Sequence, residues 1–185
     1  RALRSNSLRS VAHPVLRQLA EETGERVTLE VLSGLGGEEA AVMLVIDEVA
    51  STHLLGINQF VGSRLPVHAT STGKAVLAYA GDEVQAELLA GAEAMLTEQT
   101  MTKGKGLAAD LEQIRRRGFA TAMGELEVGL MATAAPIFNH AGEVIAALSI
   151  VGPSVRIDEE KLLALGERAK ATAGEVSFKL GFRKG

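Results

Sequence analysis

Three hydroxyl residues in a row, Thr70, Ser71 and Thr72, stand directly before Gly73 and the short apolar run Ala75–Ala78. Each hydroxyl can cap a helix that begins here, because Thr and Ser side chains accept hydrogen bonds from the unpaired N–H groups of a first turn. The N-terminus of a buried helix also attracts anions, since its free N–H groups and the helix dipole both point at the ligand. We therefore expect this turn to form the floor of a binding pocket for a small organic anion.

Ser71 and Lys74 also have the spacing S-x-x-K, in which a serine at a helix N-terminus is activated by a lysine one turn later. The Lys-Thr-Gly and Ser-Asp-Asn elements that accompany this pair in penicillin-binding enzymes do not occur in the sequence. A phosphate-binding loop is also excluded, because Ala75 stands where such a loop has the Ser or Thr that binds Mg²⁺. We expect no catalytic residues, and a small serine enzyme is kept as an alternative.

Composition narrows the classes of function. The 185 residues contain no cysteine, which excludes disulfides, thiolate metal sites and cysteine nucleophiles. The four histidines have no metal-ligand spacing, so neither a metal nor a cofactor is expected. A net charge of −4 argues against a DNA-binding surface on this chain. No apolar run approaches the roughly 20 residues of a membrane span, so we expect a cytoplasmic protein without a membrane partner.

Hydrophobic patterning predicts the elements that would position the hydroxyl turn. Apolar residues at helical spacing indicate a first helix that ends at Gly24, with a kink or a fresh helix start at Pro14. Further helices are expected at Asp82–Leu89, from Leu107 to the C-cap Gly118, and after the N-cap Asp158. Strands are expected at Val27–Leu32, Ala40–Val49, His53–Ile57, Phe119–Ala122, Leu130–Phe138 and Val144–Val151. This pattern predicts an α+β fold of two layers, with mostly antiparallel strands.

The segment Leu65–Ala75, L-P-V-H-A-T-S-T-G-K-A, resembles the signature of the effector-binding domain of IclR-type transcriptional regulators. Further positions resemble the same family and follow the family's order along the sequence: Arg115–Phe119, Glu125, Gly129, Ala134–Phe138 and Ala146–Ile150. The resemblance implies a GAF- or PAS-like sheet with helices packed on it. It also implies that residues 14–185 form the effector-binding domain, and that residues 1–13 end a linker helix from a DNA-binding domain absent from this chain.

The resemblance further implies which residues face the ligand. Ala122, Ala132, Ser149 and Val151 align with the family's pocket, and Met131 lies on the same strand as Ala132. Because only Ser149 among them has a hydroxyl, the pocket favours an effector with an apolar body. Together with the hydroxyl turn, the predicted effector-binding residues are Thr70, Ser71, Thr72, Gly73, Ala122, Met131, Ala132, Ser149 and Val151. The family's glutamate, here Glu125, is expected to hydrogen-bond backbone groups near the pocket.

In such regulators the effector modulates DNA binding by an N-terminal winged helix-turn-helix, and the resemblance implies the same arrangement here. Operator DNA is then a partner only through that absent domain, and a homodimer or homotetramer is expected. The apolar residues of Leu8–Leu19 are a candidate contact between copies. The second alternative, beside the serine enzyme, is an oligomerisation module without a ligand.

Overall fold

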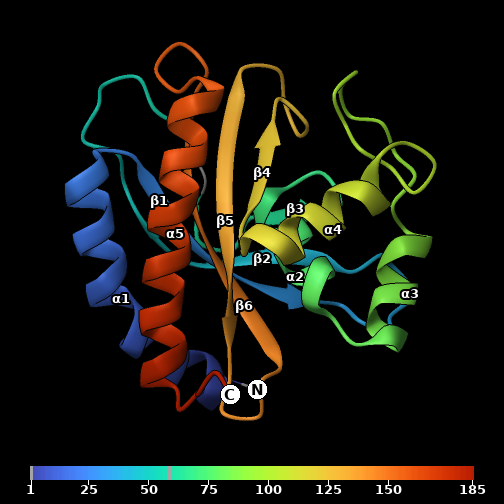
Figure 1. The fold of residues 1–185 in the computed structure, drawn as a ribbon, viewed down its shortest axis with the longest axis horizontal. Helices are drawn as coiled ribbons and strands as arrows, with labels where there is room; N and C mark the ends of the chain where they lie inside the picture. Colours follow the sequence, from blue (N-terminus) through green and yellow to red (C-terminus); the bar gives the residue numbers. More distant parts are fainter. Residues whose placement is uncertain (1, 58–59) are drawn as a thin grey trace.

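The computed structural model describes residues 2–57 and 60–185, and within them the chain forms five helices and one six-stranded sheet (Figure 1). The helices are α1 (Ala2–Thr23), α2 (Ser71–Tyr79), α3 (Asp82–Ala90), α4 (Leu107–Arg117) and α5 (Glu159–Lys179). The strands are β1 (Arg26–Ser33), β2 (Val42–Val49), β3 (Arg64–Pro66), β4 (Ala120–Met123), β5 (Leu130–Phe138) and β6 (Val144–Pro153). The predicted α+β class and the helices packed on the sheet are confirmed.

The strands lie in the order β3-β2-β1-β6-β5-β4, and every neighbouring pair is antiparallel. The first strand therefore lies beside the last one at the centre of the sheet. In this register Thr28 of β1 is opposite Ser149 of β6, and Glu30 is opposite Ala147. Residues far apart in the sequence thus meet in one part of the sheet.

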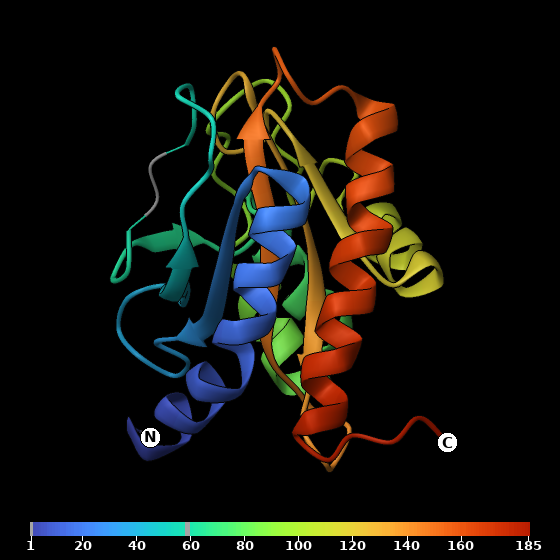
Figure 2. The same ribbon diagram turned by 90° about the vertical axis from the view of Figure 1, so that its left-hand side faces the viewer.

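Helices cover both faces of the sheet, so the predicted two layers are in fact three. One face is covered by α1 and α5, which lie side by side in Figure 2, and the other by α2 and α4 (Figure 1). The burial of β5 explains this arrangement, because Leu130–Ile137 is buried at every position instead of at alternate ones. A strand that is apolar on both sides must be covered on both sides.

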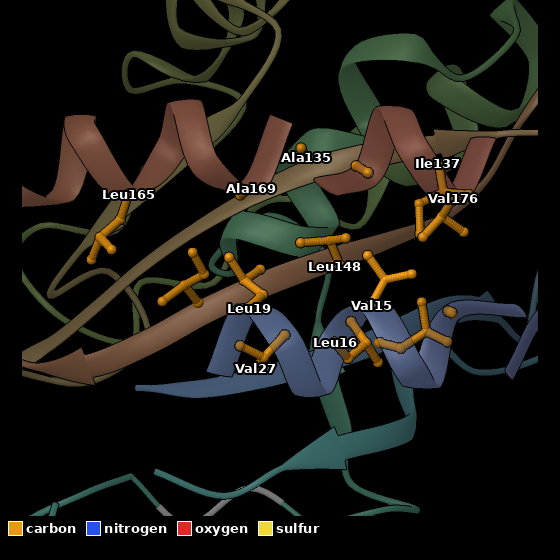
Figure 3. Packing of buried hydrophobic residues seen from close by; sticks show 14 of the residues in the cluster. Val15, Leu16, Leu19, Val27, Ala135, Ile137, Leu148, Leu165, Ala169 and Val176 are labelled. Carbon is orange, nitrogen blue, oxygen red and sulfur yellow. The ribbon is translucent and has the colours of Figure 1, made fainter. Parts of the chain in front are cut away.

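The core between α1, α5 and the sheet is built from apolar side chains that recur on one face of each helix (Figure 3). Leu16 and Leu19 of α1 meet Val27 and Leu148 of the central strands. Full burial of such a side chain is worth about 1.5–3 kcal/mol. Leu8 is buried in the same core, so the apolar face of Leu8–Leu19 is used within the domain and not as the contact between copies suggested above.

Capping residues and glycines predicted most helix ends correctly, but two other predictions from the sequence are wrong. The helix α1 continues through Pro14, so a fresh helix start there is wrong. The predicted strand at His53–Ile57 is also wrong, and Arg64–Pro66 takes its place by pairing with β2. Directly after β2 the chain is held by a side chain instead, because the Ser51 hydroxyl donates to the Gly24 carbonyl at 2.8 Å.

Candidate functional site

The hydroxyl turn begins α2, as predicted, and Thr70 is the residue that caps it. Thr70 has extended backbone angles, and its Oγ1 accepts from the N–H of Gly73 at 3.1 Å. The Thr70 carbonyl accepts from the N–H of Lys74 at 3.0 Å. Of the N–H groups predicted to bind a carboxylate, that of Gly73 is therefore used by the cap. Those of Ser71 and Thr72 have no hydrogen-bond partner within residues 2–57 and 60–185.

Gly73 has a steric role beneath the site. A Cβ at this position would lie 1.9 Å from the Val67 carbonyl oxygen and 2.6 Å from the Val67 Cα. The chain that leads into α2 therefore passes directly against the first turn of the helix. Only a residue without a side chain permits this approach, which fixes how the turn is presented to the sheet.

A small cavity lies between the start of α2 and the sheet. It is lined by Glu30, Leu65, Ala69, Thr70, Ser71, Thr72, Ala122, Leu126, Leu130, Ala132, Ser149 and Val151. All the predicted binding residues except Gly73 and Met131 thus face one space. Its volume is about 10 Å³, roughly the room that one water molecule needs. The pocket therefore has little free room in this structure.

The sheet register explains why three small apolar residues share one wall of the cavity. Ala132 of β5 lies opposite Ala122 of β4 on one side and opposite Val151 of β6 on the other. Met131 does not belong to this wall, because successive side chains of a strand point to opposite faces. Its side chain is buried in the core on the α5 side of the sheet, which corrects its predicted place in the pocket.

A chain of hydrogen bonds runs through the polar side of the cavity. The hydroxyls of Ser149 and Thr28 lie 2.6 Å apart, and the Thr28 hydroxyl donates to Oε1 of Glu30 at 2.8 Å. The Thr72 hydroxyl donates to Oε2 of Glu30 at 2.6 Å. Burial raises the pKa of Glu30 above its ordinary value, although the two donated hydrogen bonds oppose this shift.

Sequence reasoning missed Glu30 and Thr28. They alternate with Val27 and Leu29, a pattern that normally indicates a strand with one face in solvent. The alternating pattern is visible in the sequence, but it does not show whether the polar face is exposed or buried. That face is buried because α2 packs on it, and the packing of α2 depends on the whole fold.

Lys74 lies one turn into α2 and is completely buried. Its ammonium group donates to Oδ2 of Asp110 at 2.6 Å and lies 2.9 Å from Oε1 of Glu125. Glu125 also accepts from the backbone N–H of Met123 at 3.3 Å, as predicted for a backbone-binding glutamate. Burial raises the pKa of Glu125, and the charge of Lys74 opposes that shift. Because Lys74 is held by two carboxylates, it is not placed to deprotonate Ser71.

A second and larger cavity, of about 300 Å³, lies between α4 and the start of α5. Its lining includes Asp110, Arg117, Glu125 and Glu159, and it contains none of the predicted binding residues. Within the described part of the chain, no group of three or more His, Cys, Asp or Glu side chains is arranged to hold a metal ion. None of the described helices has the length and apolar character needed to cross a membrane.

Comparison with known proteins identifies the family. Residues 1–178 match the family described as "Bacterial transcriptional regulator IclR C-terminal". The chain belongs to the IclR C-terminal domain family. It is 37% identical over 181 residues to the transcriptional repressor IclR of Escherichia coli K12, which covers 97% of this chain and 64% of that protein. It is 34% identical over 175 residues to the transcriptional repressor AllR of the same strain, which covers 94% of this chain and 62% of that protein.

Solved structures of IclR proteins share the fold. The Thermotoga maritima IclR has a TM-score of 0.83 and 31% identity, covering 95% of this chain and 69% of that one. The C-terminal domain of the E. coli regulator KdgR has a TM-score of 0.80 and 30% identity, covering 95% of this chain and 99% of that one. The IclR-type chain thus spans about 64% of the length of the curated E. coli relative. These relatives are named as repressors and regulators, which does not support the serine-enzyme alternative.

Proposed function

We propose that this chain is the ligand-sensing domain of an IclR-type transcriptional regulator and that its effector is a small organic acid with an apolar body. The observation that carries the proposal is the cavity at α2, where residues from the helix start, β4, β5 and β6 meet. The N–H groups of Ser71 and Thr72 suit a carboxylate. The wall of Ala122, Ala132 and Val151 suits an apolar group.

The small volume of the cavity, about 10 Å³, implies that the effector must enlarge it. Leu126 lies in the short link between β4 and β5 and is only partly buried. It therefore borders both the cavity and the surface of the domain. Outward movement of this link would open space beside Ala122 and Ala132 without disturbing the central strands. We propose this route of entry for the effector.

The direct test is a thermal-shift screen of aliphatic and aromatic carboxylic acids, each compared with its neutral amide. An acid at a hundred times its Kd should stabilise the fold by about 2.7 kcal/mol. Ala132→Leu should abolish the shift, because the larger side chain fills the space that the ligand's apolar group needs. Ser149→Ala should weaken binding by about 1 kcal/mol through loss of one hydrogen bond.

The matched control is Ala108→Leu, which adds the same atoms at an exposed position of α4 and should leave the acid-induced shift intact. Larger shifts from amides than from acids would contradict the anion site. A hit that binds Ala132→Leu as well as the unaltered chain would show that the ligand lies elsewhere.

We also propose that the complete regulator is cytoplasmic, assembles as a homodimer or homotetramer, and contacts operator DNA through a winged helix-turn-helix outside residues 14–185. Residues 1–13 would then end the linker helix.

Leu54 and Leu55, both exposed in the loop between β2 and β3, replace the α1 face as candidate contacts between copies of the domain. Light scattering of this chain should give at least a dimer mass, and Leu54→Ser with Leu55→Ser should reduce it. A monomer mass at micromolar concentration would contradict self-association through this domain.

A further inference from the structure

We propose that Glu30 determines, through a chain of hydrogen bonds, whether the side-chain hydroxyls of the pocket can donate a hydrogen bond to the ligand, so that binding of an anionic effector is coupled to the uptake of one proton. This inference rests on the function proposed above and adds a residue that the family resemblance did not assign. The chain runs Ser149–Thr28–Glu30–Thr72, and both of its ends line the cavity.

When Glu30 is ionised, every hydroxyl proton of the chain is used inside it. Thr28 and Thr72 each donate to one carboxylate oxygen of Glu30. Since the Thr28 proton is committed, the short contact with Ser149 can be made only if Ser149 donates to Thr28. Three protons then serve three hydrogen bonds. The ends of the chain offer a ligand only oxygen lone pairs, which repel a carboxylate.

When Glu30 is protonated, the four side chains of the hydrogen-bond chain hold four hydroxyl or carboxyl protons, but they form only three hydrogen bonds with one another. If the new proton is on Oε1, Glu30 donates to Thr28, Thr28 donates to Ser149, and the Ser149 hydroxyl is free to donate into the cavity. If it is on Oε2, Glu30 donates to Thr72, whose own hydroxyl proton becomes free. In both cases a hydroxyl at the cavity wall becomes a donor. An anionic ligand therefore selects the protonated chain, and a carboxylate beside it disfavours the ionised form.

No charged group in the described part of the chain contacts Glu30. The charged groups on the neighbouring elements have other partners: Arg26 of β1 pairs with Glu48, Asp47 of β2 contacts His13, and Lys74 of α2 pairs with Asp110 and Glu125. His68, just before α2, is hydrogen-bonded to the Ala94 carbonyl, and β6 has no charged residue. Burial without a cationic partner raises the pKa of Glu30 above its ordinary value. The hydrogen-bond chain Ser149–Thr28–Glu30–Thr72 can therefore gain a proton when an anionic ligand enters the pocket.

The test is isothermal titration calorimetry of this chain with benzoate and with hexanoate. Runs at one pH in two buffers of different ionisation enthalpy give the number of protons taken up, which should approach one where free Glu30 is ionised. Affinity should fall as pH rises, by at most about tenfold per pH unit. Benzamide and hexanamide, which can donate and accept, should take up no proton.

Glu30→Gln supplies a permanent donor in the same place. The affinity of the Glu30→Gln variant for benzoate and hexanoate should be independent of pH. At alkaline pH it should exceed the affinity of the unaltered protein. The matched control is Asp47→Asn, which neutralises a buried carboxylate that bonds to His13 of α1 and should leave the pH dependence unchanged. Acid binding without proton uptake and with pH-independent affinity would overturn this inference and leave the proposed function standing. Absence of acid binding at every pH would overturn both.

Discussion

Replacing Lys74 by methionine is expected to lower the free energy of unfolding by about 3–5 kcal/mol. Lys74 is completely buried, and its ammonium group compensates the carboxylates of Asp110 and Glu125. Methionine fills a similar volume but leaves two carboxylates in the interior without a cation. The loss should appear in urea unfolding as a lower transition midpoint with an unchanged slope.

Two further variants separate lost charge compensation from lost packing. Lys103→Met changes a lysine in the exposed turn before α4 and should alter stability by less than about 0.5 kcal/mol. Adding Asp110→Asn and Glu125→Gln to Lys74→Met should recover part of the loss, because no uncompensated charge is then buried. If Lys74→Met were no more costly than Lys103→Met, the buried ion pairs would not support the fold.

Substitution of Gly73 by alanine is expected to cost about 3 kcal/mol or more, at or above the upper end for overpacked sites. The added Cβ would meet the Val67 carbonyl oxygen at 1.9 Å and its carbonyl carbon at 2.5 Å. These are backbone atoms, so no side-chain rotation relieves the contact, and α2 must move away from the preceding chain. Thermal unfolding of the variant measures the loss, and acid-induced shifts should disappear with it because the pocket floor is displaced.

Gly174→Ala is the matched control, and its effect should have the opposite sign. Gly174 lies inside α5, and a Cβ there would have no neighbour within 4 Å. Alanine should therefore stabilise the helix by about 0.5–1 kcal/mol. Equal effects at the two positions would show that helix propensity, and not the close approach to Val67, determines the outcome at Gly73.

The features that could be predicted from the sequence are those set by neighbouring residues. Asp158 caps α5 by accepting from the N–H of Lys161, and Gly118 ends α4 with a left-handed backbone. The hairpin between β5 and β6 follows from its turn residues in the same way. In each case the residues that decide the structure lie within a few positions of one another, so a local pattern contains the information.

Features that depend on distant residues could not be predicted. The partners of Lys74 lie 36 and 51 positions away, and no local pattern links them to α2. The third strand was misplaced because the edge of β2 accepts whichever segment the loop brings to it, and here that segment is Arg64–Pro66. Glu30 was missed because Thr28 and Glu30 alternate with Val27 and Leu29, a pattern typical of a strand with one face in solvent. Only the packing of α2 on that face makes it part of the site.

The two faces of β1 have a consequence for how a signal could leave the pocket. Thr28 and Glu30 point toward α2, whereas Val27 and Leu29 are buried in the core that contains α1. A slip of one residue would exchange the two faces, so the strand can respond to pocket contents only by moving as a whole. Because protein interiors are close-packed and compress little, α1 must follow such a movement. Protonation of Glu30 on the α2 side of β1 would thus displace helix α1 on the opposite side.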